Sequence, residues 1–321
     1  MRILLWLMAA CAKTDHIERL PDAPVPVPTL TADVDPVMSR GAQLYRTASC
    51  VGCHSPPFSD GTHLGGGRDL PTMFGVFYAP NISPDPVEGI GGWSEADFVT
   101  AMRQGRAPDG SRYWPTFPYM TYTGMSDDDL HALWVYLTAQ PPVDTTSRTH
   151  SINAPYRYPG MLGMWRLMAF RDGPLEDDTR QSDQWNRGRY LVKAVSYCDQ
   201  CHTPRGPLGL VKKRHDMAGG ANPGKADIHP NLTPDPVVGL GEWSEADIAA
   251  YLSTAVKPDG TQTEDKDIMA EKIHDSFSHY SDEDRAAIAA YLAALPADDF
   301  DPAQWRVVRR AQRKLASEGA Q

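Results

Sequence analysis

Two stretches dominate this 321-residue sequence, Cys50-Val-Gly-Cys53-His54 and Cys198-Asp-Gln-Cys201-His202, and together they hold four of its five cysteines. The two frames are offset by 148 residues, and the sequence around them repeats as well. The segment 80–97 returns at 230–247, and 16 of the 31 residues from 80 to 110 are identical 150 positions later. Such a repeat predicts two homologous domains. We place them at 36–140 and 184–297.

Each frame has the form Cys-x-x-Cys-His, which is the attachment signature of c-type haem. The two thiols lie one helical turn apart and can add to the vinyl groups of one porphyrin, while the histidine is placed under the iron. A zinc site shared by both pairs is disfavoured, because 144 residues separate Cys53 from Cys198. A thioredoxin-like pair needs no histidine and lies beside a βαβ pattern, which we do not find. We therefore predict two covalent haem c groups, held by Cys50, Cys53, His54, Cys198, Cys201 and His202.

The helix signals recur with the same repeat. A serine followed by acidic residues in the next turn predicts the start of a helix, because the serine side chain caps free backbone N–H groups. This signature occurs twice in each domain, at Ser94, Ser126, Ser244 and Ser281. Sustained alternation of β-branched residues, which indicates strands, is nearly absent. The sequence therefore predicts an all-α fold in which each domain wraps around one haem.

The sixth ligand of each iron separates electron carriers from enzymes, because a vacant position can bind a substrate. In the second domain Met269 lies 67 residues after His202, whereas Met217 follows that histidine by only 15. We predict Met269 as the axial ligand. In the first domain Met120 and Met125 compete, and the spacing alone leaves both open.

The motifs resemble those of the di-haem members of the cytochrome c subunit family that serves periplasmic alcohol, aldehyde and sugar-acid dehydrogenases. The resemblance covers residues 36–297 and rests on Cys201-His-Thr-Pro, the repeated Asn-Ile/Leu-Ser/Thr-Pro-Asp-Pro blocks and Met269-Ala-Glu. The family motif Phe/Met-Pro-Tyr-x-x-Tyr-x-x-Met-Ser/Thr-Asp corresponds to 117–127, which implies Met125 as the ligand of the first haem. Many relatives carry three Cys-x-x-Cys-His frames and this chain has two, which implies a shorter relay.

The resemblance implies two tandem cytochrome c domains and a one-electron carrier between a periplasmic dehydrogenase and the respiratory chain. Such a carrier has no catalytic residue, and histidine and methionine together saturate each iron. The alternative is a di-haem redox enzyme, similar to a thiosulfate dehydrogenase or a peroxidase, with one substrate-accessible haem. A five-coordinate iron, or an iron without a methionine ligand, would favour that enzyme.

The first 35 residues predict export and tethering. Met1-Arg2 is followed by a short apolar run that ends before Cys11, and this run is far shorter than the 20 or so residues that a membrane-spanning helix needs. The sequence Leu7-Met-Ala-Ala-Cys11 resembles a bacterial lipobox, which predicts a periplasmic protein anchored to the membrane through lipidated Cys11. The alternative is an ordinary secretory signal that is removed together with Cys11. The proline-rich segment 21–28 predicts an extended tether.

Charge excludes one class of partner. The chain has 31 basic and 41 acidic residues, a net charge of −10 and a pI near 5.4. Binding to a phosphate backbone requires clustered positive charge, so we predict no nucleic-acid partner.

Two further segments lie outside the predicted domains, an interdomain linker at 141–183 and a basic C-terminal tail at 298–321. Within the linker, residues 156–170 are unusually rich in methionine and other apolar residues. We expect these residues to pack across the interface between the domains. A docking surface for another subunit or for the membrane is the alternative.

Overall fold

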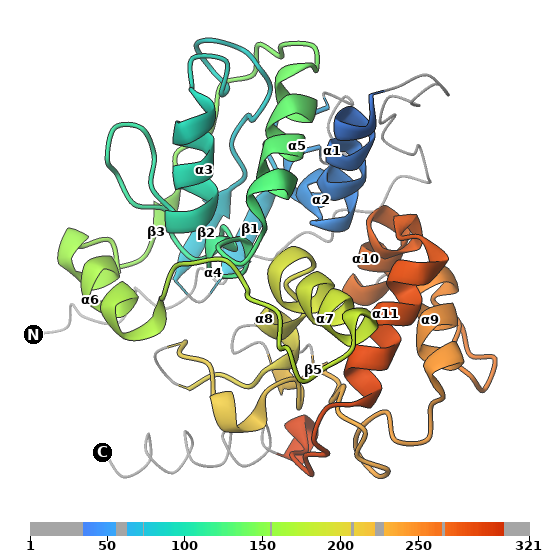
Figure 1. The fold of residues 1–321 in the computed structure, drawn as a ribbon. Helices are drawn as coiled ribbons and strands as arrows, with labels where there is room; N and C mark the ends of the chain where they lie inside the picture. Colours follow the sequence, from blue (N-terminus) through green and yellow to red (C-terminus); the bar gives the residue numbers. More distant parts are fainter. Residues whose placement is uncertain are drawn as a thin grey trace, which may run out of the picture.

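The computed structural model describes residues 35–55, 63–72, 74–154, 156–206, 209–221, 228–264 and 267–304. Helices predominate and recur in the same order in two halves of the chain (Figure 1). The predicted signal, the tether with Cys11 and the tail beyond residue 304 lie outside the described residues.

The first half begins with helix α1 (Pro36–Thr47) and the short attachment helix α2 (Cys50–His54). The remaining elements before the second half are β1 (Asp69–Thr72), β2 (Gly75–Tyr78), α3 (Glu95–Gln104), α4 (Tyr119–Tyr122), α5 (Asp127–Thr138), β3 (Ser151–Ile152) and α6 (Pro159–Ala169).

The second half begins with α7 (Asp183–Tyr190), which continues into a π-helical turn, η1 (Leu191–Val195), before the attachment helix α8 (Cys198–His202). It continues with η2 (Lys213–His215), β4 (Gly220–Ala221), β5 (Ile228–His229), α9 (Glu245–Thr254), α10 (Ile268–Asp275), η3 (Phe277–His279) and α11 (Asp282–Ala293).

The four predicted serine caps are confirmed. Ser94 and Ser244 form capping boxes, in which the serine Oγ accepts from the backbone N–H three residues on and an aspartate returns a bond to the serine N–H. Ser126 and Ser281 cap α5 and α11 through the same Oγ contact. The acidic residues that follow each serine lie in the first turn, where a carboxylate is stabilised by the helix dipole.

Each half is closed by a crossing of its first and last helices, α1 with α5 and α7 with α11. A glycine makes each crossing possible, since a Cβ on Gly41 would lie 2.1 Å from the carbonyl oxygen of Ala132 and a Cβ on Gly188 would lie 1.9 Å from that of Ala287. The preceding arginine ties the same two helices together. Bidentate ion pairs join Arg40 to Asp129 and Arg187 to Asp284, with N–O distances of 2.7–2.9 Å.

Strands modify the all-α prediction. The described part of the chain contains five short strands of two to four residues, arranged as an antiparallel sheet β1-β2-β3 and an antiparallel pair β4-β5. Gly75 permits the close approach of β2 and β3, because a Cβ there would lie 2.1 Å from the carbonyl oxygen of Ser151. Segments this short give no sustained alternation of side chains, and for that reason the sequence pattern does not reveal them.

The two halves pack directly on each other, with α4 against η1 and α10 against α2. The Ser49 and Ser276 hydroxyls are 2.8 Å apart across this interface, and Arg68 Nη1 lies 2.6 Å from Glu271 Oε1. Tyr190 of α7 donates its hydroxyl proton to Asp129 of the first half at 2.6 Å. Elements around each Cys-x-x-Cys-His frame therefore lie against elements of the other half.

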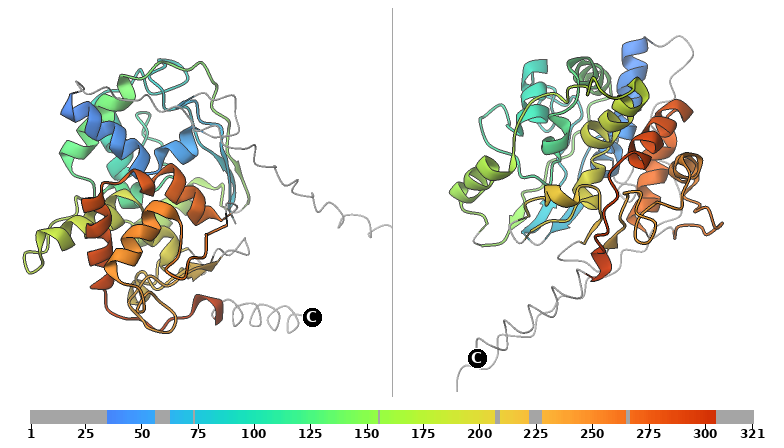
Figure 2. Two further views of the ribbon diagram at one scale, coloured as in Figure 1. Left: turned by 90° about the vertical axis from the view of Figure 1, so that its right-hand side faces the viewer. Right: turned by 60° about the horizontal axis from the view of Figure 1, so that its bottom comes forward.

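The apolar linker segment does not fill this interface. Its residues form α6, which projects from the body of the protein (Figures 1 and 2) and leaves Met161, Met164, Leu167 and Met168 between 37% and 88% exposed. The expected interdomain packing is therefore wrong. The halves meet through α10, α4 and the turns beside the attachment helices instead, so α6 is not needed there. Across the described ranges, no helix has both the length and the apolar character required to span a membrane.

The helix crossings generate a stability prediction. Gly41→Ala and Gly188→Ala should each lower the free energy of unfolding of the haem-loaded protein by about 1–3 kcal/mol, because the added methyl group displaces a packed helix. Thermal denaturation followed by circular dichroism measures the effect. Gly160→Ala is the matched control, since a Cβ there meets nothing within 4 Å. Equal melting temperatures for Gly41→Ala and Gly160→Ala would contradict the crossing.

Candidate haem-attachment sites

The two cysteine frames form short helices that begin in the same unusual way. The residue before each helix, Ser49 or Tyr197, has a left-handed backbone with φ of 57° or 44°. This conformation is uncommon for residues other than glycine. It turns the chain sharply between the preceding helix and the attachment helix, in which the two cysteines of a frame lie about one helical turn apart. Because the same strained conformation occurs in both halves, the fold requires this backbone geometry directly before each attachment helix.

Among the described residues, the four frame cysteines form no disulfide, which leaves their sulfurs available for thioether bonds. Burial raises the pKa of the Cys50 thiol to about 12, and that of the Cys198 thiol to about 12 as well, so both are protonated near neutral pH. In the described ranges, no three His, Cys, Asp or Glu residues lie close enough together to hold a metal ion. The two cysteine pairs thus stay apart, each in its own half.

The histidine of each frame is held in the tautomer and orientation that an iron ligand requires. His54 Nδ1 lies 2.8 Å from the carbonyl oxygen of Pro80, and His202 Nδ1 lies 2.8 Å from that of Pro230. Because a carbonyl can only accept, Nδ1 carries the proton and Nε2 keeps its lone pair for a metal. Burial lowers the pKa of His54 and lowers that of His202 to about 4, so both rings are neutral near pH 7.

The same contact explains the repeated Pro-Asn block. Asn81 follows Pro80 and donates from Nδ2 to the carbonyls of Val143 and Thr145, at 2.6 and 3.1 Å. Asn231 likewise donates to the carbonyls of Asp298 and Phe300, at 2.7 and 3.2 Å. Each asparagine therefore ties the proline carbonyl that orients the histidine to the segment after the closing helix.

A cavity of about 570 Å³ adjoins the first attachment helix, within the range of about 300–1,000 Å³ that is usual for cofactor sites. Its lining is mainly aromatic and aliphatic, and it includes Cys50, Cys53, His54, Phe77, Trp93, Phe98, Met102, Trp114, Phe117, Tyr122, Leu133 and Leu137. Two thiols, an oriented imidazole and an apolar chamber fit a covalently attached haem. Tyr197 and Gln200 of the second half also line this cavity.

The candidate axial sulfurs occupy different structural positions. Met269 is the second residue of α10 and is partly buried against the core, and Met120 is the second residue of the corresponding helix α4. Met125 is fully buried and directly precedes Ser126, the N-cap of α5. The corresponding position in the second half, directly before the N-cap of α11, is occupied by Tyr280. Position along the repeat therefore favours Met120, whereas burial and the family motif favour Met125.

Two other methionines have packing counterparts. Met217 is fully buried at a left-handed position, and Leu64 has the same burial and backbone conformation in the first half. Met102 of α3 lines the cavity beside the first frame, and the sequence analysis did not consider it. Its repeat partner is the buried Leu252, so an apolar packing role explains Met102.

A cation beside the first frame is a further feature that the sequence analysis missed. Lys272 of α10 lies at the interface of the halves, where its Nζ is 3.4 Å from the point that a Cβ on Gly52 of the first half would occupy and 5.4 Å from the ring centre of Tyr197 of the second half. Arg68 donates to the Gly52 carbonyl on the same helix. The sequence spacing places Lys272 and Met269 on one short helix. Only the packing of the two halves shows that Lys272 lies beside the first frame.

Paired thiols, a neutral histidine with a free Nε2 and an adjoining apolar cavity define a c-type haem site. Comparison with known proteins agrees with this class, since residues 38–140 match the cytochrome c family. A di-haem c-type cytochrome of Cereibacter sphaeroides is 40% identical over 276 residues, which are 84% of this chain and 90% of that protein. The chain belongs to the family of di-haem c-type cytochromes.

Cytochrome subunits of dehydrogenases are also similar to this chain. The fructose dehydrogenase cytochrome subunit of Gluconobacter japonicus is 35% identical over 84% of this chain and 55% of its own length. The gluconate 2-dehydrogenase cytochrome c subunit of Pantoea cypripedii is 34% identical over 83% of this chain and 61% of its own length. The chain thus spans little more than half the length of these subunits.

Lys272 generates a prediction about the first haem. Lys272→Met should lower the reduction potential of that haem by on the order of tens of millivolts, because a nearby cation disfavours the more positive ferric state. A spectroelectrochemical titration of the two haems measures the shift. Lys257→Met, which changes an exposed lysine of the second half, is the control. A first-haem potential that is the same in both variants would contradict a role for the Lys272 charge.

Proposed function

We propose that this protein is a di-haem carrier that transfers single electrons between a periplasmic dehydrogenase and a respiratory-chain acceptor. One observation carries the proposal, the duplicated contact from a neutral histidine of each Cys-x-x-Cys-His frame to a proline carbonyl. Its occurrence in both halves supports a second cytochrome c domain at 184–297 with its own haem. The names of the related dehydrogenase subunits support the choice of partner.

The residues have separate roles in this proposal. Cys50 and Cys53 would hold one haem by thioether bonds, and Cys198 and Cys201 would hold the other. His54 and His202 would each give Nε2 to an iron, while Met125 and Met269 would give the opposite sulfur ligands. The bound haem supplies the one-electron couple between ferrous and ferric iron, and a methionine ligand favours the ferrous state.

The packing of the halves supports transfer between the two sites. Gln200 lies within the second attachment helix, between Cys198 and Cys201, and yet it lines the cavity beside the first frame. It lies 3.3 Å from Thr121 Oγ1 of the first half, and the neighbouring Tyr197 ring packs edge-on against Tyr122. The second attachment helix therefore borders the first cavity directly.

The N-terminal sequence supports a location at the periplasmic side of a membrane. A signal that ends at Cys11 would export the chain, and lipidation of that cysteine would hold it at the membrane, where respiratory acceptors lie. The proline-rich tether would place the two haem domains above the membrane surface.

A second candidate function is a redox enzyme with one substrate-accessible haem. The observation that favours it is the lining of the first cavity, in which Met102 is the one methionine among the described residues. If neither Met125 nor Met120 binds the iron, the first haem would keep an open position. Carbon monoxide distinguishes the candidates, because it binds ferrous haem readily when a position is vacant.

The haem content is the first test of the proposal. The purified protein should carry two covalent haems, and Cys198→Ala should leave one firmly attached, since a thioether bond requires the cysteine sulfur. Intact-protein mass spectrometry and the pyridine haemochrome spectrum measure both values. A wild-type mass equal to that of the bare polypeptide would rule out the assignment.

The axial sulfurs are tested by single substitutions. Met125→Leu and Met269→Leu should each remove about half of the methionine-to-iron charge-transfer band and open one haem to carbon monoxide, because leucine keeps the volume without a donor atom. Met102→Leu should leave the band unchanged. Loss of the band in Met120→Leu with an intact Met125→Leu spectrum would transfer the ligand role to Met120.

The partner is tested by purification. The full-length protein from membranes of its own organism should bring a dehydrogenase with it, and the substrate of that enzyme should reduce the haems. Cys11→Ser should release the protein into the soluble fraction. A wild-type protein that is soluble, purifies alone and is reduced by no dehydrogenase of the organism would contradict the proposal.

A further inference from the structure

The geometry points to the outer face of α6 as the docking surface for the electron-donating dehydrogenase, through a patch on that enzyme where carboxylates surround apolar side chains. This inference rests on the proposed function, because it assumes that a dehydrogenase reduces the protein. Two features form the surface, the α6 ridge (Met161, Met164, Leu167 and Met168) and an arginine pocket beside it (Arg106, Arg112 and Arg157).

The α6 ridge is apolar and has no partner among the described residues. Met161, Met164 and Met168 lie at helical spacing on one side of α6, with Leu167 next to them, and their exposed fractions are 37%, 57%, 56% and 88%. The other side of the helix is fixed to the first half. Arg166 lies over the rings of Tyr119 and Phe170, at 4.7 and 4.8 Å, and donates to the Gln104 carbonyl at 2.6 Å. The helix therefore presents its ridge from a firm base.

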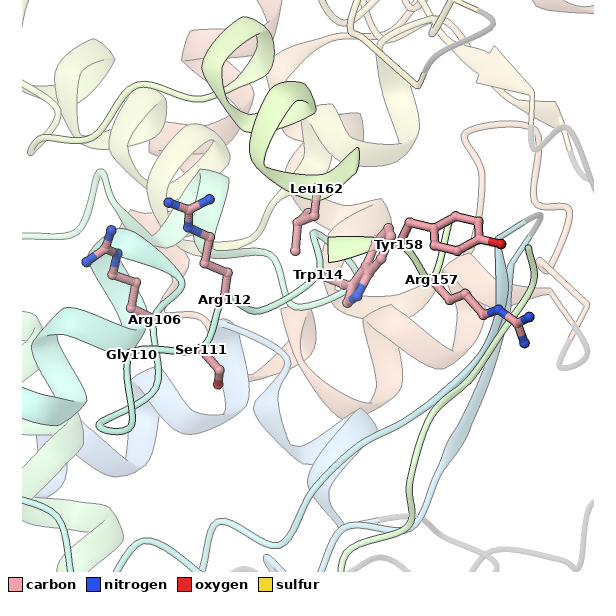
Figure 3. A pocket seen from close by; sticks show the side chains of 8 residues that line it. All are labelled: Arg106, Gly110, Ser111, Arg112, Trp114, Arg157, Tyr158 and Leu162. Carbon is pink, nitrogen blue, oxygen red and sulfur yellow. The ribbon is translucent and has the colours of Figure 1, made fainter. Parts of the chain in front are cut away.

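The arginine pocket gives the surface its charge. It has a volume of about 410 Å³, and Leu162 points into it from α6, while Arg106 and Arg112 come from the loop before Trp114 and Arg157 comes from the segment just before α6 (Figure 3). No carboxylate is among its lining residues, and within the described part of the chain none of the three arginines forms a salt bridge. This local positive charge stands out in a chain whose net charge is −10.

The surface lies next to the first haem site. Trp114 lines the arginine pocket and also lines the cavity beside Cys50, Cys53 and His54. A partner seated against α6 would therefore be separated from that cavity by one indole side chain. Because electron transfer requires a short distance between donor and acceptor, this position suits the point where electrons enter the protein.

A protein partner fits these features better than a membrane does. The arginines line a recess, which a projecting carboxylate side chain can enter, whereas lipid headgroups form a broad plane. Methionine side chains adapt to irregular apolar surfaces and are common where proteins bind partners. Transient redox partners also form small interfaces, and an apolar centre beside charged residues is the usual arrangement.

The test uses full-length, haem-loaded protein and the dehydrogenase that purifies with the wild type. One variant removes the ridge (Met164→Ser, Leu167→Ser and Met168→Ser), a second reverses the pocket charge (Arg112→Glu and Arg157→Glu), and the control is Val237→Ser, an equally exposed position of the second half. We measure the rate at which the substrate-loaded dehydrogenase reduces the haems, at low and high salt. Reduction by ascorbate and binding to vesicles of phosphatidylglycerol are measured in parallel.

Both docking variants should be reduced by the dehydrogenase about tenfold more slowly, while the control stays within about twofold of the wild type. The charge variant should also lose the salt dependence of the rate, and ascorbate should reduce all proteins equally. Wild-type rates in both docking variants would overturn the surface while leaving the proposed function intact. Weaker vesicle binding with unchanged dehydrogenase rates would assign α6 to the membrane instead. A wild type that no dehydrogenase reduces would overturn the proposed function and this inference together.

Discussion

The hydrogen bond from the frame histidine to a proline carbonyl is the contact on which the rest of the structure depends. It fixes the proton on Nδ1 of His54 and His202, and it thereby leaves Nε2 of each ring free to bind iron. The carbonyl is in turn held by the next residue, Asn81 or Asn231, whose amide is bound to the chain beyond the closing helix. One line of contacts therefore joins each candidate iron ligand to the segment that follows the closing helix of its half.

The association of the two halves changes the environment of each site. Helix α10, which carries Met269, also places Lys272 beside the first attachment helix, and α8 places Gln200 in the lining of the first cavity. Residues close to one cysteine frame are thus neighbours of the other frame. With a haem at each frame, the charge at one site would shift the reduction potential of the other.

Much of the fold and of the site follows from the sequence alone. The repeated frames, the four serine caps and the offset blocks predict two similar helical halves, and the structure confirms the caps and the order of helices. The short strands of the described residues were missed because two to four residues leave no periodic pattern. The position of α6 was predicted wrongly, because apolar composition indicates that a segment is covered without indicating by what. The position of Lys272 beside the first frame was missed because it depends on how the two halves pack. Met102 was missed because the corresponding residue of the second half is the apolar Leu252, which indicates a packing role.

The electron paramagnetic resonance spectrum of the fully oxidised, purified protein tests the central claim most directly. Two haems that each have a histidine and a methionine ligand must both be low-spin, since two strong axial ligands saturate the iron. The account therefore predicts two low-spin ferric signals of equal intensity for each polypeptide chain. A high-spin ferric signal of one haem, or low-spin signals that integrate to one iron per chain, would contradict a two-site electron carrier.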